Sequence, residues 1–452
     1  MELTPDRILE EFYKKNIDEP FATQLLLSLV ESSENEEIRV ESIKKLNHIG
    51  IKDDEVFKLL ENLLISDSNE TMRKTAAIVL RDNFMDKALE PVKWAFMHEV
   101  SPSCLTINYS TLIEIITTIV SKPNSFNKSI LLTEVKNIRR SEFRLGFEDL
   151  YGARKIEDVT VKELGEILIN HLTVILLEKL FWRLKYKIEK CKIVELDFIF
   201  KGLVSLPESL QYLTHLKVLI LRYNQLTQIP DWIGDLNCLE TLNINVNNLN
   251  KLPVSIGALS YLRELSLWKN ELIHLPSTIG NLANLEILNL RLNQLKSLPK
   301  TIGSLSSLQE LNLHDNHLTH LPLSIGDLKN LKNLNLSWNR FKILPRSIGY
   351  LPSLKVLDLE RNELIDLPNS IGSLSSLEFL NLSDNRLKKL PESIGNLSSL
   401  QYLNLSRNEL DSIPESLESL VSLKDLYLGE NNLHSVPKNI KKLEDDGLKI
   451  YN

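Results

Sequence analysis

The chain has 452 residues, of which 43% are hydrophobic and 25% are charged, and its formal net charge at pH 7 is −7. This composition supplies a sizeable core and two or three domains, and the acidic balance excludes the strongly basic class of nucleic-acid and membrane-surface binders. The three cysteines (Cys104, Cys191 and Cys238) form neither a metal-binding pattern nor a disulfide framework, so we expect a reducing, cytoplasmic compartment.

The sequence predicts neither a secretion signal nor a membrane-spanning segment. The first residues, MELTPDRILEEFYKK, are charged and lack the apolar core that a signal peptide requires. The longest apolar runs, such as residues 172–177, are too short to span a bilayer. We therefore expect no membrane insertion.

Residues 19–120 predict pairs of helices that repeat. An apolar helix stripe at Leu25, Leu26, Leu29 and Val30 returns with the same internal spacing at Leu59, Leu60, Leu63 and Leu64. The second helix of each pair repeats at the same offset, and Asn35 and Asn69 stand at matching helix starts. The paired helices, with an apolar-Arg dipeptide opening the second, resemble HEAT-type repeats. The resemblance implies an all-α, HEAT-like domain over residues 1–125, with a generic helical bundle as the alternative.

Residues 126–192 are predicted to be a helical connector and an N-terminal cap. The polar stretch SKPNSFNKSI at 121–130 predicts a boundary. Thr160 and Glu163 fit a capping box before a helix over 161–170. A second helix over 172–189 is predicted from apolar residues at steps of four, namely Leu176, Leu180, Leu184 and Ile188. Its basic residues from Lys179 to Lys190 form either a solvated face or a nucleic-acid contact.

From residue 193 the chain repeats one phrase at a fixed interval. At Leu308 it reads LQELNLHDNHLTHLPLSIGDLKN, and the same frame returns at Leu331. Its asparagine recurs without insertion at Asn224, Asn247, Asn270, Asn293, Asn316, Asn339, Asn362, Asn385, Asn408 and Asn431. A fixed period of roughly 20–50 residues is the signature of a solenoid. Leu311 and Leu313 are two apart and share one strand face, which must point inward because a single unit cannot fold alone.

Three further positions of the phrase are predicted to be scaffold. Asn316 follows the strand where the chain turns, and an inward amide there can satisfy backbone groups that would otherwise cost roughly 1–3 kcal/mol each. Pro322 is predicted to open the outer arc, because its fixed φ suits a first helical turn. Gly326 is predicted to let that arc turn back.

The spacing L-x-x-L-x-L-x-x-N resembles that of leucine-rich repeats. The outer half, L-P-x-S-I-G-x-L, resembles the SHOC-2-like class of Ras-pathway scaffolds and the plant intracellular Ras-group leucine-rich repeat proteins. The resemblance covers residues 193–443, as one degenerate coil in which Lys201 replaces the asparagine and ten regular coils, with 444–452 as a C-terminal cap. It implies an α/β solenoid, a right-handed horseshoe with a parallel β-sheet on its concave face. Secreted members carry cysteine-rich caps, which both ends of this repeat region lack.

Positions that the consensus leaves free are predicted to line the concave face and to bind a protein. Exposed Trp, Tyr and Arg are the residue types that dominate binding hot spots. The candidates are Arg222, Tyr223, Trp268, Lys269, Arg291, His314, Asp315, Trp338, Glu360, Arg361, Asp384 and Arg407. A neighbouring column with six asparagines is expected to form a flat polar ribbon. The alternative is that these are scattered exposed residues without a role.

The sequence carries no recognisable catalytic motif. It contains no P-loop, no G-x-S-x-G, no H-E-x-x-H and no C-x-x-C. His314, His317 and His320, with Asp315, could bind zinc only if they converged, and on a single coil they are expected to diverge. We therefore predict no enzyme activity, no cofactor, no metal and no small-molecule substrate.

The predicted function is that of a monomeric cytoplasmic scaffold whose concave face binds a folded protein. The resemblance implies a small GTPase or a phosphatase/kinase complex as the partner. Two alternatives stay open, each with the solenoid as a targeting module. One is a small catalytic unit within residues 121–190, where Glu142, Glu148 and Asp149 supply carboxylates. The other is nucleic-acid binding by the basic helix, which would weaken steeply with salt.

Overall fold

The chain folds into two compact units. The computed structural model describes residues 3–151, 158–434, 440, 444 and 447–451, with only the backbone for 147 and 149–151. The helical unit comprises Met1–Leu184 and Ile188–Lys192, and the solenoid unit comprises Lys185–Lys187 and Ile193–Asn452. The predicted boundaries at residues 125, 192 and 443 describe a finer division, which stays a prediction.

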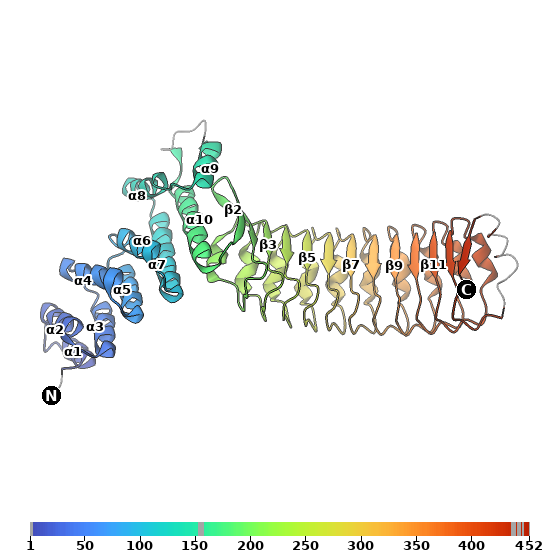
Figure 1. Cartoon of the computed structure of the whole chain (residues 1–452), viewed down its shortest axis with the longest axis horizontal. Helices are drawn as coiled ribbons and strands as arrows, with labels where there is room; N and C mark the ends of the chain where they lie inside the picture. Colours follow the sequence, from blue (N-terminus) through green and yellow to red (C-terminus); the bar gives the residue numbers. More distant parts are fainter. Residues whose placement is uncertain (1–2, 152–157, 435–439, 441–443, 445–446, 452) are drawn as a thin grey trace. The chain divides into compact units, whose positions relative to one another are not determined.

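The helical unit is built from helices that pack in sequential pairs. Figure 1 shows α2 beside α3 and α4 beside α5, and α6 packs on α7 in the same way. The helices are α1 (Pro5–Tyr13), α2 (Glu19–Ser32), α3 (Glu36–Ile49), α4 (Asp54–Ser66), α5 (Glu70–Asn83), α6 (Leu89–His98), α7 (Pro102–Ser121), α8 (Ser125–Lys136), α9 (Ser141–Tyr151) and α10 (Val161–Leu180).

The predicted repeat of the first helix pairs is confirmed by matching helix starts. The side chain of Asn35 caps α3 by accepting hydrogen bonds from the backbone N–H groups of Glu37 and Ile38. Asn69 caps α5 in the same way. Short polar side chains favour this position because they satisfy N–H groups that the helix leaves unpaired. The helices that begin there are buried at matching positions, namely Ser42, Ile43 and Leu46 in α3 and Ala76, Ala77 and Leu80 in α5.

Arginines at matching positions join each helix pair to the next. Arg39 donates to the carbonyl of Val30 at 2.9 Å and to the carboxylate of Asp67 at 2.8 Å. Arg73 pairs with Glu99 through two hydrogen bonds of 2.9 and 3.2 Å. The side chains of Asp67 and Glu99 are only 9% and 7% exposed. Because a buried carboxylate needs a partner, each arginine holds in place the loop that follows the next helix.

The segment after Thr160 differs from the prediction in its second half. The capping box of Thr160 and Glu163 is present, but one helix, α10, replaces the two predicted helices. It ends at Leu180, and residues 185–189 form strand β1 (Lys185–Glu189). The predicted helix over 172–189 is therefore wrong beyond Leu180.

The basic helix that motivated a nucleic-acid alternative does not exist as predicted. The ammonium of Lys179, near the end of α10, donates to the carbonyls of Met97 and Glu99 at 2.9 and 3.0 Å. Lys185 and Lys187 lie on strand β1 instead. These lysines therefore do not share one helix face.

The polar stretch at 121–130, where a boundary is predicted, contains the turn between two helices. Helix α7 continues to Ser121 and α8 begins at Ser125. The side chain of Asn124 caps α8 by accepting a hydrogen bond from the N–H of Asn127 at 2.8 Å. The Pro and Asn residues there mark a sharp turn between two helices.

Helix α7 is the central helix of the helical unit. Within the described residues, it alone is long and apolar enough to cross a membrane by length and composition. Half of that apolar window is buried, and α7 packs against α5, α6 and α10. The hydroxyl of Tyr109 also bonds Thr173 of α10 at 2.7 Å. These contacts explain why α7 is apolar: it is a core helix of the helical unit.

The solenoid unit carries a single long β-sheet, as predicted. Within the described residues its thirteen strands lie in chain order, and each strand from β2 onward pairs in parallel with the next. They are β1, β2 (Lys192–Asp197), β3 (Val218–Ile220), β4 (Thr241–Asn243), β5 (Glu264–Ser266), β6 (Ile287–Asn289), β7 (Glu310–Asn312), β8 (Asn333–Asn335), β9 (Val356–Asp358), β10 (Phe379–Asn381), β11 (Tyr402–Asn404), β12 (Asp425–Tyr427) and β13 (Lys449–Tyr451). The fold class, an all-helical region followed by a parallel-sheet solenoid, is confirmed.

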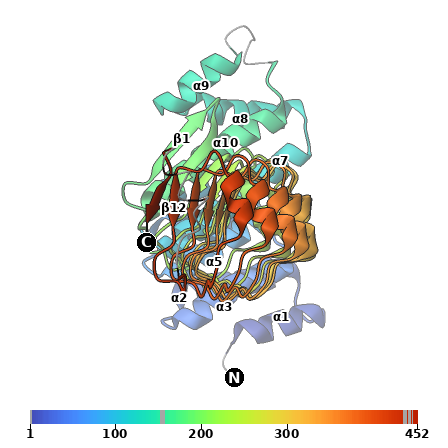
Figure 2. The ribbon, with the colours of Figure 1, turned by 90° about the vertical axis from the view of Figure 1, so that its right-hand side faces the viewer.

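In the coils of β2 to β11, short 3-10 helices form the side opposite the sheet. Figure 2, which looks along the solenoid, shows the strands on one side and these helices on the other. A proline precedes each helix, and Pro322 has the φ of −67° expected of its ring. The helices are η2 (Glu208–Tyr212), η3 (Asp231–Asp235), η4 (Val254–Ala258), η5 (Ser277–Asn281), η6 (Lys300–Ser304), η7 (Leu323–Asp327), η8 (Arg346–Tyr350), η9 (Asn369–Ser373), η10 (Glu392–Asn396) and η11 (Glu415–Ser419).

The glycine of each outer helix from η3 to η10 is needed for close packing and not for a turn. Gly326 does not adopt a left-handed φ, so the predicted role in turning the arc back is wrong. A Cβ at Gly326 would lie 2.6 Å from the carbonyl oxygen of Ser347, and one at Gly349 would lie 2.0 Å from that of Ser370. Each of these serines belongs to the next coil, so the glycines let successive coils approach each other.

The asparagine of each regular coil binds backbone inside the solenoid, as predicted. The side-chain amide of Asn316 donates to the carbonyls of Leu290 and Leu313 at 3.0 and 3.1 Å. Its oxygen accepts from the N–H of Leu295 at 3.0 Å. Leu290 and Leu295 belong to the preceding coil, so the asparagine closes its own turn and also joins two coils.

The first coil keeps the register without its own asparagine. The residues predicted to hold the register are buried, namely Ile193, Leu196, Phe198, Leu203 and Leu206. Asn224 of the next coil accepts hydrogen bonds from the N–H groups of Lys201 and Leu203. At the other end, the predicted cap over 444–452 is described at 444 and 447–451, and residues 449–451 form the last strand.

Candidate protein-binding surface

The outward side of the sheet, predicted to be concave, carries three columns of residues that the core does not fix. In each coil the strand-end column is the last strand residue, such as Asn312 in β7. The two exit columns lie two and three residues later, at His314 and Asp315 in that coil. We call these columns on coils β3–β12 the sheet face. All predicted binding residues belong to the two exit columns.

The structure places all of these residues at the surface. Seven are exposed: Arg222, Tyr223, Lys269, Arg291, Trp338, Arg361 and Arg407. Five are half-buried: Trp268, His314, Asp315, Glu360 and Asp384. All twelve therefore keep surface that a partner can touch.

The second exit column has a left-handed backbone in every regular coil. Its φ lies between 52° and 59° from Tyr223 to Glu430. Most L-residues avoid this region because of their Cβ, yet Val246, Leu292 and Trp338 occupy it here. The left-handed residue turns the chain so that the following asparagine enters the interior. Its own side chain stays outside, where it can contact a partner.

The strand-end column is polar, as predicted, but much of its polarity is used within the chain. The side-chain oxygen of Asn335 accepts hydrogen bonds from the N–H and hydroxyl of Ser337. Asn381 and Asn404 bond Ser383 and Ser406 in the same way. Such local bonds stabilise the strand exit. The side-chain oxygens of these asparagines therefore serve the scaffold.

A cluster of four side chains occupies the middle of the sheet face. We call it the central cluster, and it consists of His314, Trp338, Arg361 and Asp384. The guanidinium of Arg361 lies over the Trp338 ring at 4.1 Å from its centroid. The Nε of Arg361 also bonds the Asp384 carboxylate at 2.9 Å. Neighbouring coils thus hold the Trp338 ring, which is 42% exposed, in one orientation.

His314 extends the central cluster toward the preceding coil. Its ring centroid lies 6.0 Å from that of Trp338, and its Nδ1 bonds the Ser337 hydroxyl at 2.8 Å. Burial, and then the positive charge of Arg291, lower the pKa of His314. The imidazole is therefore kept neutral, which suits packing against an aromatic ring.

His314, His317 and His320, with Asp315, do not form a metal site in this arrangement. Within the residues that the structure describes, no three His, Cys, Asp or Glu side chains come together to hold an ion. The Nδ1 of His314 faces Ser337, whereas that of His320 faces Thr319 at 3.1 Å. The two rings thus have separate partners.

Trp268 lies in an exit column but is partly embedded. Its backbone N–H donates to the side-chain oxygen of Asn245 at 2.7 Å. Its indole N–H is buried without a hydrogen-bond partner among the described residues. An unsatisfied buried donor of this kind carries a desolvation cost.

An aromatic row at the last coils was missed by the sequence analysis. Phe379 stacks on Tyr402 with ring centroids 4.4 Å apart, and Tyr427 stacks on Tyr451 at 4.3 Å. Tyr402 and Tyr427 connect the two stacks at 5.3 Å. Phe379 and Tyr402 repeat at the first strand position, a signal that the sequence did contain. Tyr451 lies on β13, outside the consensus.

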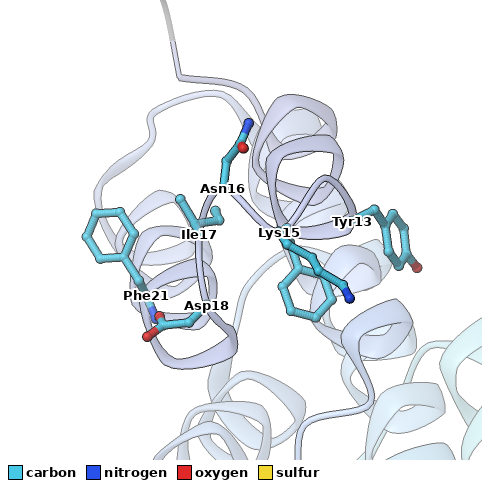
Figure 3. A pocket seen from close by; sticks show the side chains of 7 residues that line it. Tyr13, Lys15, Asn16, Ile17, Asp18 and Phe21 are labelled. Carbon is cyan, nitrogen blue, oxygen red and sulfur yellow. The ribbon is translucent and has the colours of Figure 1, made fainter.

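A wide surface pocket lies between α1 and α2 of the helical unit. Figure 3 shows Tyr13 and Lys15 on one side of it, and Asp18 and Phe21 on the other. Its volume is about 830 Å³. The Asp18 carboxylate already caps α2 by accepting from the N–H of Phe21 at 3.0 Å, and the other charged side chain of the described lining is Lys15. These lining groups do not form a set that could perform catalysis.

The carboxylates considered for a catalytic unit do not converge in the described residues. Glu142 accepts a hydrogen bond from the adjacent Ser141 hydroxyl at 3.1 Å. Glu148 lines a small cavity of about 170 Å³ with Phe143 and Arg144. The side chain of Asp149 lies outside the described residues. Glu142 and Glu148 therefore do not assemble a pair with an acid and a base role.

Comparison with known families identifies the family to which the solenoid belongs. A sequence model described as a leucine-rich repeat region matches residues 204–290, 255–337 and 369–445, and a second leucine-rich repeat model matches 329–387. The matched ranges run without a gap from 204 to 445, more than half of the chain. The chain belongs to the leucine-rich repeat superfamily. No curated protein matches it.

Solved structures of leucine-rich repeat proteins are similar to this chain. A TDR receptor structure is 30% identical, with a TM-score of 0.53, over 62% of this chain and 49% of the receptor. A leucine-rich repeat protein of Leptospira interrogans is 33% identical over 56% of this chain and 82% of its own, with a TM-score of 0.34. The plant peptide hormone receptor RGFR1, solved with RGF2, is 28% identical over 54% of this chain and 45% of the receptor, with a TM-score of 0.45. This chain spans about half the length of either receptor.

Proposed function

We propose that this leucine-rich repeat protein is a non-catalytic scaffold that binds a folded protein partner on its sheet face. Leucine-rich repeat proteins generally mediate protein–protein interaction, and an extended row of parallel strands offers a surface for another macromolecule. The single observation that carries the proposal is the central cluster. It holds an exposed tryptophan in place by an arginine, which is itself fixed by a carboxylate.

The central cluster has the properties expected of a binding hot spot. Trp and Arg dominate such spots, and a side chain already held in one rotamer loses little conformational entropy on binding. Trp338 has no core role, because its ring lies outside the coil while Asn339 enters it. An exposed aromatic ring ordered by its neighbours is therefore best explained by contact with a partner.

The finer class of the protein forms part of this proposal. The L-P-x-S-I-G-x-L outer half supports a SHOC-2-like or plant intracellular Ras-group type. That class implies a small GTPase or a phosphatase/kinase complex as the partner. The three free cysteines and the lack of cysteine-rich caps beside the repeats support a cytoplasmic location.

The helical unit is proposed to be a HEAT-like array that provides a second docking surface. Its support is the common spacing that separates Asn35 from Asn69 and Arg39 from Arg73. These arginines join consecutive helix pairs through buried carboxylates. A repeated inter-pair contact of this kind is expected of stacked helical repeats.

The proposal is tested by affinity capture with the full chain, followed by binding measurements on the purified partner. Trp338→Ala should weaken binding by about 2 kcal/mol, or about 30-fold in Kd. Tyr350→Ala is the matched control, since Tyr350 is 52% exposed but lies on an outer helix of the same solenoid. Equal affinity of the wild type and both variants would rule out the sheet face as the binding surface.

A further inference from the structure

We propose that the first regular coils of the sheet face bind an acidic segment of the partner that also carries apolar side chains. This inference rests on the proposed function and names the chemistry of the partner. The surface, which we call the basic strip, lies on the exit columns of four successive coils. It consists of Arg222, Tyr223, Val246, Trp268, Lys269, Arg291 and Leu292.

The cations of the basic strip have no counter-ion within the described part of the chain. Arg222, Lys269 and Arg291 are exposed, and none forms an ion pair there. On the later coils, two cations of the same columns are paired. Arg361 bonds Asp384 at 2.9 Å and Arg407 bonds Glu430 at 3.0 Å. The difference leaves three positive charges that a ligand can neutralise.

No carboxylate interrupts the basic strip. The exit columns of its four coils hold no Asp or Glu, and the first acidic residue in these columns is Asp315. The nearby Glu286 lies before strand β6, where it pairs with Arg263 at 2.9 Å. A ligand that lies along the exits therefore meets unopposed positive charge, and carboxylates are protein groups that arginine binds strongly.

Apolar side chains alternate with the cations. Tyr223 is 36% exposed and stacks on Phe200, which is 71% exposed, with centroids 4.6 Å apart. Val246 and Leu292 occupy left-handed backbone positions that keep their side chains outside the core. Contact with Val and Leu stabilises a complex by removing apolar area from water. These side chains provide neither a positive charge nor a hydrogen-bond donor for a phosphate backbone. This composition favours a protein segment over a nucleic acid.

The dimensions of the basic strip fit a short extended segment. Neighbouring strands lie about 4.8 Å apart, so the three steps from the coil of Arg222 to that of Arg291 cover about 14 Å. An extended chain rises about 3.3 Å per residue and needs about five residues to cover that distance.

The experiment selects ligands from a random pool of peptides. A phage library of random peptides, about 12 residues long so that they exceed the strip, is selected on the immobilised full chain. An enriched peptide is then synthesised, and its Kd is measured for three proteins. These are the wild type, the triple variant R222E/K269E/R291E and the control K300E/K342E/R346E. The control reverses three exposed cations elsewhere on the solenoid, so it matches the change in net charge.

We expect enriched peptides to hold an excess of Asp and Glu together with Leu, Phe or Trp. The strip reversal should weaken their binding at least tenfold, whereas the control should change it less than twofold. The inference fails if the enriched peptides have no acidic excess, if both triple variants bind equally, or if nothing is enriched over bare resin. Tighter binding of a single-stranded RNA of similar length than of the peptide would also overturn it.

The outcome is separate from that of the proposed function. If no acidic peptide is selected but Trp338→Ala still weakens binding of the captured partner, only the basic strip is assigned wrongly. If acidic peptides bind but the captured partner ignores Trp338→Ala, the basic strip stands and the central cluster is not the partner's site.

Discussion

Each regular coil is closed by one asparagine that serves two coils. Asn316 satisfies the N–H of Leu295 and the carbonyls of Leu290 and Leu313. Leucine would fill the same space but would leave those backbone groups unpaired in the interior. At the scale of the residue, the solenoid therefore depends on hydrogen-bond geometry as well as on apolar packing.

Replacement of this asparagine should destabilise the solenoid far more than replacement of an exposed one. Asn316→Ala leaves buried N–H and C=O groups without partners, and we expect a loss of about 3 kcal/mol in the free energy of unfolding. Asn330→Ala, in the same repeat, removes one exposed hydrogen bond to Ser306 and should cost less than about 0.5 kcal/mol. Chemical denaturation of both variants measures the difference, and similar losses would contradict the assigned role.

At the residue scale, the interior could be predicted from the sequence but the strand exits could not. The asparagine role follows from period and polarity alone. The left-handed column carries no such signal, because it contains Val246, Trp338 and Arg361 in place of the Gly or Asn that normally mark it. The hydrogen bonds from the serines to the strand-end asparagines that precede them depend on that same backbone turn.

At the scale of the element, buried ion pairs fix one helix pair against the next. Burial raises the pKa of the Glu99 carboxyl, but hydrogen bonds from Arg73 and from the N–H groups of Ser101 and Val100 outweigh burial, so the net shift is downward. Glu99 is therefore charged and bonded although it is buried. Its partner Arg73 lies on α5, and Glu99 follows α6, so the pair connects consecutive repeats.

Removal of the arginine should destabilise the helical unit strongly. Arg73→Ala leaves the Glu99 charge buried without its partner, and we expect a loss of about 3–5 kcal/mol in the free energy of unfolding. Lys87→Ala is the control, because the pair of Lys87 and Asp54 is 2.6 Å long but exposed. Such a surface pair generally contributes little. Thermal or urea unfolding that gives the two variants equal stability would refute the structural role of the Arg73 pair.

The helical unit should also lose stability in mild acid because of His171 on α10. Burial, and then the positive charge of Arg140, lower the pKa of His171 to about 4. The unfolded chain binds this proton near pH 6.5, so it holds more protons than the folded chain between about pH 6.5 and 4. Stability is therefore full above pH 6.5 and falls by up to about 3 kcal/mol as the pH drops through this window.

The variant His171→Gln isolates this effect. The difference in unfolding free energy between the wild type and the variant should change across pH 6.5 to 4, with the wild type losing more as the pH falls. Urea titrations at several pH values measure it. Parallel pH profiles of the two proteins would show that His171 does not titrate differently on folding.

The boundaries of elements were predictable only where periodicity was unambiguous. The helix starts at Asn35, Asn69 and Thr160 carry capping signals and were predicted. The end of α10 was missed because the apolar residues from Leu176 to Ile188 recur every four residues. This spacing fits one face of a helix, but it also fits one face of a strand, on which every second residue lies. The run Lys185-Tyr-Lys-Ile-Glu189 alternates charged and β-favouring residues, which was the available strand signal.

The last strand could not be predicted for a different reason. Leu403 of β11 pairs with Leu426 of β12, and Leu426 pairs with Ile450 of β13. The second pair is therefore separated by one residue more than the first, which has the regular spacing of the repeat. The consensus ends before this strand, so the repeat gives no phase for it. Tyr451, and with it the aromatic row, became visible only when the chain was folded.

At the scale of the whole molecule, the repeat separates the scaffold from the surface that we propose for recognition. The interior and the coil-to-coil contacts use leucines and asparagines that recur in the regular coils, and glycines that recur in the outer helices η3–η10. The exit columns differ from coil to coil, so they can encode a specific partner. The exit columns carry the basic strip and the central cluster, and the aromatic row lies on the strands of the last coils. A partner that contacts more than one of these regions would gain affinity from several small contacts.

Hydroxyl-radical footprinting of the full chain with its captured partner tests the central claim most directly. Oxidation of aromatic side chains reports their exposure on both sides of the same solenoid. We expect the partner to protect Trp338 and Tyr223 on the sheet face. Tyr261 and Tyr350, which are 63% and 52% exposed away from the sheet face, should stay as reactive as in the free protein. Protection of Tyr261 and Tyr350 with unchanged oxidation of Trp338 and Tyr223 would contradict the account.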